Sequence, residues 1–204
     1  MTHKITGLFI KQSIIFIIAI SSLILFIPND SWAFTREKNV INQKFSNLCG
    51  CKAILLENRD YFPTLLKAID EAQKEIIMSF FLFKIGKHPN NYPEILIEHL
   101  KKAAKRGIRI QIVLERSDER LSDDINHENQ QTAERLKEKN ITICFDFPKK
   151  TTHTKIIVID GRYTIIGSHN LTHSALKYNN ELSVMIDSKE IAEETIRYIK
   201  SLHP

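Results

Sequence analysis

Four polar side chains that could act together on one phosphate group fall within eighteen residues of each other. They are an imidazole, an ammonium group, a hydroxyl and an amide, from His153, Lys155, Ser168 and Asn170. A neutral imidazole can attack phosphorus, a lysine can hold a nonbridging oxygen, and a hydroxyl and an amide can donate hydrogen bonds to the same group. This set suits the cleavage of a phosphate diester by nucleophilic and electrostatic catalysis.

The residues between these side chains predict the structure that must position them. Residues 156–159 and 163–166 are rich in strand formers, and Asp160 and Gly161 between them favour a tight turn. Side chains alternate between the two faces of a strand, so His153 and Lys155 should share one face, and the serine and asparagine should share another. We therefore expect a β-hairpin in which all four groups converge.

The spacing of these residues resembles the signature of the phospholipase D superfamily: H-x-K, four residues, D, six residues, G-S-x-N. The sequence matches it at His153, Lys155, Asp160, Gly167, Ser168 and Asn170. The resemblance runs from about Lys52 to the C-terminus, includes the SFFLF segment at residues 79–83, and is closest to the small bacterial phospholipase D-like endonucleases. It implies that an acidic residue, here Glu181, orients the motif histidine. For Asp160 it implies a structural salt bridge rather than direct chemistry.

The candidate catalytic residues are therefore His153, Lys155, Asp160, Ser168, Asn170 and Glu181, with Lys155, Ser168 and Asn170 also binding the substrate phosphate. In-line displacement at phosphorus requires a nucleophile on one side of the phosphate and a proton donor for the leaving oxygen on the other. This chain carries one motif copy; His169 should turn to the opposite face, and His173 lies beyond the motif. Single-copy relatives are understood to work as homodimers. The resemblance implies the same here, with one active site shared by two copies.

Three functions are compatible with this set. The favoured one is a metal-independent phosphodiesterase that forms a phosphohistidine, needs no cofactor and acts as an endonuclease on DNA or RNA. A phospholipase D acting on phospholipid head groups is the alternative, but the chain has no long insertion that could build a deep acyl-chain pocket. The third is a non-catalytic nucleic-acid or membrane binding module, which the intact set of site residues disfavours. A metal site built from His153, His169 and His173 is disfavoured, because these residues should face different ways.

The N-terminus predicts export. A weakly basic start precedes an apolar run at residues 13–27, and Ser31, Trp32 and Ala33 follow the Pro28 break. We expect residues 1–33 to be a signal peptide that is cleaved after Ala33, giving a periplasmic or secreted protein. An uncleaved membrane anchor is the alternative. Cleavage would remove two lysines and one aspartate and lower the formal net charge from +5 to +4, which permits a polyanionic substrate without establishing one.

The rest of the chain predicts an α/β domain at residues 52–204, after a polar linker at 34–51. Strand and helix patterns alternate, which is typical of a layered sheet flanked by helices. We expect strands at 52–56, 75–83, 108–114, 141–147 and 181–186, besides the hairpin, and helices at 63–72, 93–106, 128–139 and 189–202. Residues 116–131 should form a surface excursion, with a mobile loop beside the site as the alternative, and the charged helix at 128–139 should be exposed. Phe80, Phe81 and Phe83 should lie in the core. Cys49, Cys51 and Cys144 are expected to be free thiols or to form one bridge that includes Cys144.

Overall fold

The computed structural model describes residues 51–86, 91–116, 123–147 and 150–203. All of them belong to one compact unit, Leu48–Pro204. The expected signal peptide, almost the whole linker and Cys49 lie outside the described residues, so these expectations stay predictions.

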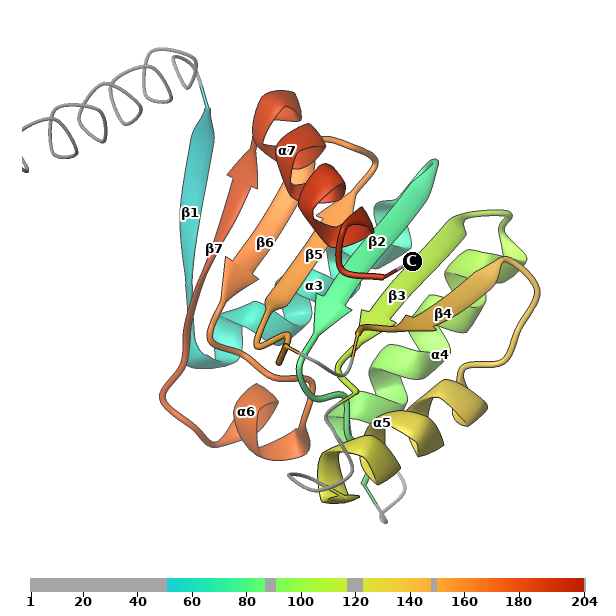
Figure 1. Ribbon diagram of the computed structural model, residues 1–204. Coiled ribbons are helices and arrows are strands. Elements are labelled where there is room, and N and C mark those ends of the chain that lie inside the picture. Colours follow the sequence, from blue (N-terminus) through green and yellow to red (C-terminus); the bar gives the residue numbers. More distant parts are fainter. Residues whose placement is uncertain (1–50, 87–90, 117–122, 148–149, 204) are drawn as a thin grey trace, which may run out of the picture. The chain divides into compact units, whose positions relative to one another are not determined.

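One mixed sheet of seven strands organises the domain, with the order β1-β7-β6-β5-β2-β3-β4 (Figure 1). β2, β3 and β4 run parallel, and the remaining neighbours pair antiparallel. The strands are β1 (Lys52–Glu57), β2 (Glu75–Phe80), β3 (Arg109–Leu114), β4 (Ile141–Phe145), β5 (Lys155–Ile159), β6 (Tyr163–Gly167) and β7 (Leu182–Asp187). At one end of this sheet β2, β3, β4 and β6 finish while β5 and β7 begin. The motif residues next to these strand ends are thereby gathered at one edge.

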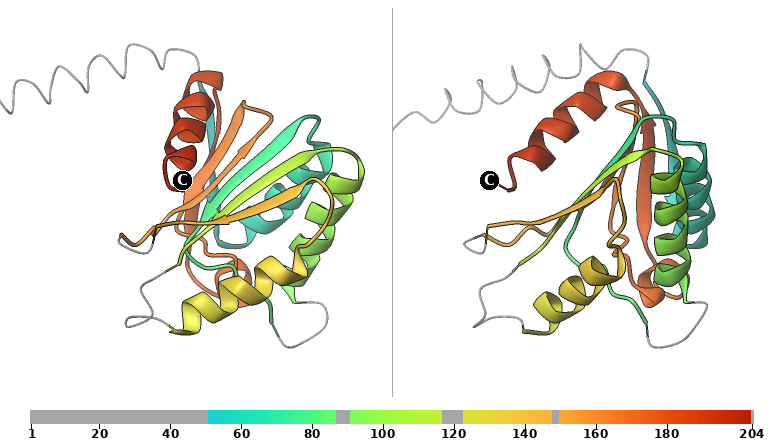
Figure 2. Two further views of the ribbon diagram at one scale, coloured as in Figure 1. Left: turned by 45° about the vertical axis from the view of Figure 1, so that its right-hand side comes forward. Right: turned by 90° about the vertical axis from the view of Figure 1, so that its right-hand side faces the viewer.

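Helices cover both faces, as the layered α/β prediction required. In Figure 2, α3 (Tyr61–Glu71) and α4 (Tyr92–Lys105) lie on one side of the sheet and α7 (Lys189–Lys200) on the other. The larger core lies on the α3 side and includes Leu65, Ile69 and Leu100, each fully buried. A smaller cluster on the other face packs Ala192 and Ile199 of α7 against strand residues such as Val158. The mixed sheet with helices on both faces confirms the predicted fold class.

The motif hairpin forms as predicted. Ile159 pairs with Tyr163, and the Arg162 amide donates to the Ile159 carbonyl at 3.1 Å. Asp160 and Gly161 have φ angles of 56° and 62°. These are the two central residues of a type I′ turn over residues 159–162, which requires positive φ at both, and Asp-Gly supplies it at low steric cost. Arg162 completes a loop of three residues between the paired Ile159 and Tyr163.

Two predictions for residues 116–139 were wrong in detail, and one short helix was not predicted. Helix α5 (Asp123–Arg135) begins five residues before the predicted start at 128, inside the stretch that we expected to be a surface excursion. It is not wholly exposed, because Asn129 and Thr132 are fully buried. A short helix, α6 (His173–Lys177), was not predicted.

The described cysteines are not bridged. Cys51 precedes one edge strand, Cys144 lies on the other edge strand, and both are free. Six strand spacings of about 4.8 Å separate the two edges by roughly 29 Å, far beyond the reach of a disulfide.

One area of the α7 face is left without a described helix. Figure 1 shows α7 crossing β6, β5 and β2 and leaving the motif ends of β1, β7 and β6 bare. Leu55 and Ile166 both pair with Val184 in this area. Leu182 lies two residues before Val184 in β7, so its side chain is on the same face of the sheet. Leu55, Ile166 and Leu182 are 63%, 41% and 52% exposed. We call these three side chains, with the half-buried Val184, the apolar patch.

Candidate active site

His153 and Lys155 meet at the start of β5. Lys155 is the first residue of the strand and is 8% exposed, whereas His153 lies two residues before it and is exposed. The Lys155 ammonium lies 3.1 Å from His153 Nδ1 and donates to the His153 carbonyl at 3.1 Å. The contact confirms that the two side chains point the same way, although His153 lies outside the strand.

The ring of Phe81 packs against both His153 and Lys155. Its ring centroid lies 4.4 Å from that of His153, and the Lys155 ammonium lies 5.2 Å from the Phe81 ring. The prediction that Phe80 and Phe83 are core residues is confirmed, since both are 0% exposed. For Phe81 it was wrong. β2 ends at Phe80, so Phe81 lies beyond the paired strand and its ring reaches the site.

The surroundings of this pair favour the neutral imidazole. Partial loss of water, followed by the positive charge of Lys155, lowers the pKa of His153 below its usual 6.5, although part of the ring stays open to solvent. Burial also lowers the pKa of Lys155, and the nearby Glu181 carboxylate opposes this shift. A neutral ring nitrogen beside a buried cation can act as a nucleophile towards an anionic phosphate.

Ser168 and Asn170 follow the end of β6 at the same edge of the sheet. Ser168 Oγ donates to the Glu181 carboxylate and accepts from the Leu182 amide at 3.1 Å. The amide oxygen of Asn170 is buried, and no described residue donates to it. Next to it, Leu171 pairs with the chain beyond β2, since its amide donates to the Leu82 carbonyl at 3.0 Å. Ser168 and Asn170 therefore lie at the same end of the sheet as His153 and Lys155, although no hydrogen bond between described residues joins the two pairs directly.

The prediction that Glu181 orients His153 is wrong within one chain. Glu181 accepts from Ser168 Oγ and from Asn179 Nδ2, the latter at 3.1 Å, whereas the described contacts of the His153 ring are to Lys155 and Phe81. The Glu181 backbone is also fixed, because its amide donates to Asn58 Oδ1 at 2.9 Å. Within one chain, Glu181 orients Ser168 and favours the charged form of Lys155.

Asp160 lies at the opposite end of β5. Its carboxylate accepts from the backbone amides of Gln73, Lys74 and Glu75 at 2.7–3.2 Å. Five residues at about 3.3 Å each place it some 16 Å along the strand from Lys155. Its role is structural, but it holds the start of β2 through backbone amides and not through the expected salt bridge.

Gly167 is the motif position at which a side chain has no room. A Cβ at this residue would collide with the side chain and backbone of Ser183 and with the Leu182 carbonyl. β6 and β7 therefore approach closely here, which sets the position of the following Ser168.

The two neighbouring histidines are structural. His169 is fully buried and stacks on Tyr61 at 4.1 Å, and its ring nitrogens lie 2.8 Å from Ser183 Oγ and 3.0 Å from the Asn58 carbonyl. His173 Nδ1 accepts from the Tyr92 amide at 3.2 Å. The prediction that His169 faces away from the site is confirmed, and both of its ring nitrogens are engaged in fold contacts.

A buried carboxylate that the sequence analysis missed supports the loop before β5. Glu115 is 1% exposed, and its carboxylate accepts from the amide of Thr152, the residue before His153. Asn129 joins this end of β3 to β2 by donating to the Glu115 and Phe81 carbonyls at 3.0 and 2.9 Å. The signal in the sequence was an acidic residue directly after a buried strand.

Two negative observations apply to the described part of the chain. No three His, Cys, Asp or Glu side chains there stand close enough together to hold a metal ion. None of its helices is both long and apolar enough to span a bilayer.

Comparison with known proteins agrees with the motif. Residues 65–203 match the family described as "Cardiolipin synthase, PLD-like domain". The chain therefore belongs to this family of the phospholipase D superfamily.

Its relatives carry different names. A phospholipase D of Rickettsia felis is 28% identical over 129 residues, which are 63% of this chain and 57% of the relative. Cardiolipin synthase B of Escherichia coli is 32% identical over 138 residues, 59% of this chain and 30% of the relative. The chain thus spans little more than half the length of the rickettsial protein.

Solved structures show the same fold. Nuc from Salmonella typhimurium, a phospholipase D family member, has a TM-score of 0.62 at 22% identity, covering 74% of this chain and 93% of Nuc. NucT from Helicobacter pylori has a TM-score of 0.58 at 19% identity, covering 74% of this chain and 95% of NucT.

Proposed function

We propose that this protein is a metal-independent phosphodiesterase, an endonuclease that cleaves DNA or RNA through a phosphohistidine on His153. The observation that carries the proposal is the contact between the exposed imidazole of His153 and the buried ammonium of Lys155. One group supplies the nucleophile, and the other supplies the positive charge that the phosphate needs.

The reaction has two displacements. A neutral nitrogen of His153 attacks phosphorus, the bond to the leaving oxygen breaks, and that oxygen takes a proton from a general acid. Water then attacks the phosphohistidine and returns a proton to the same group, and the P–N bond breaks to leave a phosphate monoester. Lys155, Ser168 and Asn170 bind the nonbridging oxygens, Lys155 through its ammonium group, Ser168 through its hydroxyl and Asn170 through the N–H groups of its amide.

The general acid in this scheme is the His153 of a second copy. His169 is held by hydrogen bonds through both ring nitrogens, and His173 accepts from the Tyr92 amide. No described contact joins either ring to His153 or Lys155, so the scheme takes its acid from the second copy. A two-fold axis beside the motif would bring in a second His153 and would place two Lys155 ammonium groups on one phosphate.

The apolar patch gives this homodimer a contact surface. It adjoins Gly167 and Glu181, which lead into the motif, and a second copy would remove its leucines and isoleucine from water. Adjacent residues of β1 provide a matched test. Leu55→Lys should yield monomers in light scattering, whereas Ile54→Lys should stay dimeric, because Ile54 is 55% exposed on the α3 face. Equal dimerisation of the two variants would refute this surface.

Nucleic acid is the favoured substrate because the described domain is compact. It covers nearly all of Nuc and NucT, and no described element beyond the flanking helices could enclose acyl chains. Phospholipid is the second candidate, and the naming of the rickettsial relative as a phospholipase D supports it.

The test is to incubate purified mature protein with plasmid DNA, RNA and phosphatidylcholine in parallel, with and without excess chelator. We expect nucleic acid cleavage that persists in chelator and is lost in His153→Ala. His99→Ala is the control, since His99 pairs with Asp70 on the α3 side. Cleavage of phosphatidylcholine alone would favour the lipase, and loss in chelator with recovery by one divalent ion would refute the covalent scheme.

We also propose that the protein is exported, with cleavage after Ala33. Mass spectrometry of periplasmic or secreted material should give Phe34 as the first residue. Recovery of residues 1–33 on protein in the membrane fraction would favour the anchor.

A further inference from the structure

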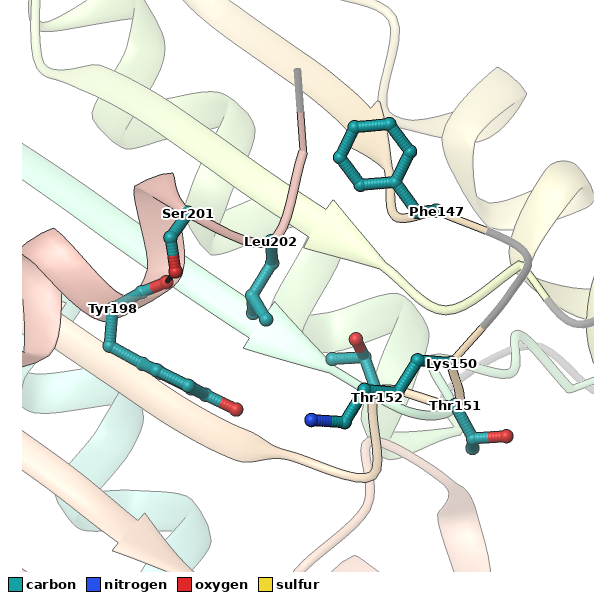
Figure 3. Close-up of a pocket in the computed structure, with 7 residues that line it drawn as sticks. All are labelled: Phe147, Lys150, Thr151, Thr152, Tyr198, Ser201 and Leu202. Atoms are coloured by element: carbon teal, nitrogen blue, oxygen red, sulfur yellow. Dashed lines mark hydrogen bonds between the residues drawn. The ribbon is translucent and has the colours of Figure 1, made fainter.

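A pocket with its own chemistry is lined in part by Thr152, the residue before His153. It has a volume of about 250 Å³ and is formed by the C-terminal end of α7 and by residues 147 and 150–152, which lie between β4 and β5 in the sequence (Figure 3). Its lining residues are Phe147, Lys150, Thr151, Thr152, Tyr198, Ser201 and Leu202. Because Thr152 is bonded to His153, the pocket lies along the segment of chain that leads into the nucleophile.

Both walls of the pocket are fixed. On the α7 side, Leu202 packs against the smaller apolar cluster, and the next residue, His203, lies 2.8 Å from Gln111 of β3. On the other side, the Thr152 amide is held by the Glu115 carboxylate. The pocket is therefore built into the fold.

Two exposed rings and one cation dominate its chemistry. Phe147 and Tyr198 are 50% and 49% exposed, and the lining contains Lys150 but no carboxylate. Figure 3 shows the Lys150 ammonium and the Tyr198 hydroxyl pointing towards one another. Flat apolar surfaces beside a positive charge and hydroxyl groups complement a nucleotide, which joins a flat base to a phosphate.

We propose that this pocket binds the nucleobase next to the scissile phosphate, with Phe147 and Tyr198 as stacking surfaces and Lys150 as a contact to the neighbouring phosphate. The proposal rests on the phosphodiesterase activity proposed above and adds a preference for unpaired bases. A base within a duplex is already stacked on its neighbours, whereas an unpaired base can turn into the pocket. An acyl chain is less suited, because the lining interrupts its apolar surface with an ammonium group and hydroxyls.

Two substrates with the same leaving group test the proposal. Thymidine 5′-(p-nitrophenyl phosphate) carries one base, and methyl p-nitrophenyl phosphate carries none. Both release p-nitrophenol from a single diester, so the ratio of their kcat/KM values isolates the contribution of the base. The ratio is measured for the wild type, Phe147→Ala, Tyr198→Ala and the control Ile54→Ala, which removes a similarly exposed apolar side chain on the opposite face.

We expect the wild type to favour the thymidine substrate. Phe147→Ala and Tyr198→Ala should each lower the ratio by about 5- to 100-fold, the range expected for loss of one base–aromatic stack, and the control should keep the wild-type ratio. A wild type that hydrolyses both substrates equally well, or pocket variants that keep the ratio, would overturn the subsite and leave the phosphodiesterase intact. A wild type that hydrolyses neither substrate would overturn the proposed function itself.

Discussion

The ammonium of Lys155 lies 3.1 Å from Nδ1 of His153, so a largely buried positive charge faces the imidazole that attacks phosphorus in our scheme. The charge opposes protonation of the ring before substrate arrives. Once the phosphate is bound, the same charge stabilises the oxygens on which negative charge accumulates. One contact thereby serves both the nucleophile and the transition state.

Replacing Lys155 should raise the pKa of His153. The folded pKa lies below 6.5, so the neutral, reactive ring is populated as pH rises through that lower value, and the acid limb of kcat/KM should fall below pH 6.5. Lys155→Gln removes one of the two causes and leaves the partial burial, so the midpoint should move upwards. NMR titration of the ring protons measures it, with Lys67→Gln on α3 as the control. An unchanged or lower midpoint in Lys155→Gln would contradict the electrostatic coupling.

Substitution at Gly167 should damage both stability and activity. Gly167→Ala forces apart β6 and β7, which we expect to cost about 1–3 kcal/mol in the free energy of unfolding and to displace Ser168. Gly161→Ala is the matched control, because a Cβ there meets nothing within 4 Å and only the positive φ is strained. It should lose roughly 1–2 kcal/mol and keep its kcat. Denaturant unfolding and steady-state kinetics of the two variants separate the effect of the steric clash at residue 167 from that of the strained φ at residue 161. Equal kcat values in the two variants would contradict the proposal that the close packing at Gly167 positions Ser168.

Asp160 should matter for folding and not for chemistry. Asp160→Ala removes the acceptor for three backbone amides and leaves a positive φ, and should cost about 2–5 kcal/mol in the free energy of unfolding. Asp160→Asn keeps an acceptor and tolerates that φ, so it should lose less. The kcat of the folded fraction should stay near the wild-type value in both. A kcat reduced by 10²-fold or more in a stably folded Asp160→Asn variant would show that Asp160 contributes to catalysis.

The hairpin and its site illustrate what sequence can predict. The Asp-Gly turn and the strand pattern around it are local, and local preferences sufficed to place His153 next to Lys155. Glu181 was assigned the wrong partner because its contact with Ser168 depends on the path of the chain between β6 and β7, which includes the unpredicted helix α6. Phe81 was taken for core because an apolar run does not reveal where strand pairing stops. Glu115 was missed since nothing local shows that the β4–β5 connection returns to it.

Subunit mixing should show whether two copies share one site. If catalysis needs His153 from both chains, a heterodimer of wild type and His153→Ala is inactive, because either the nucleophile or the acid is missing. Activity after exchange should then fall with the square of the wild-type fraction. Size measurement by light scattering accompanies the assay to verify that dimers form. A linear fall would mean that each chain works alone, and a water molecule would have to serve as the acid.

The stereochemical course at phosphorus tests the covalent mechanism most directly. A diester made chiral with sulfur is hydrolysed in ¹⁸O-labelled water, and the configuration of the product is determined. Each in-line displacement inverts phosphorus, so attack by His153 followed by attack of water predicts net retention. Net inversion would mean that water attacks the diester in a single step and would contradict the assignment of His153 as the nucleophile.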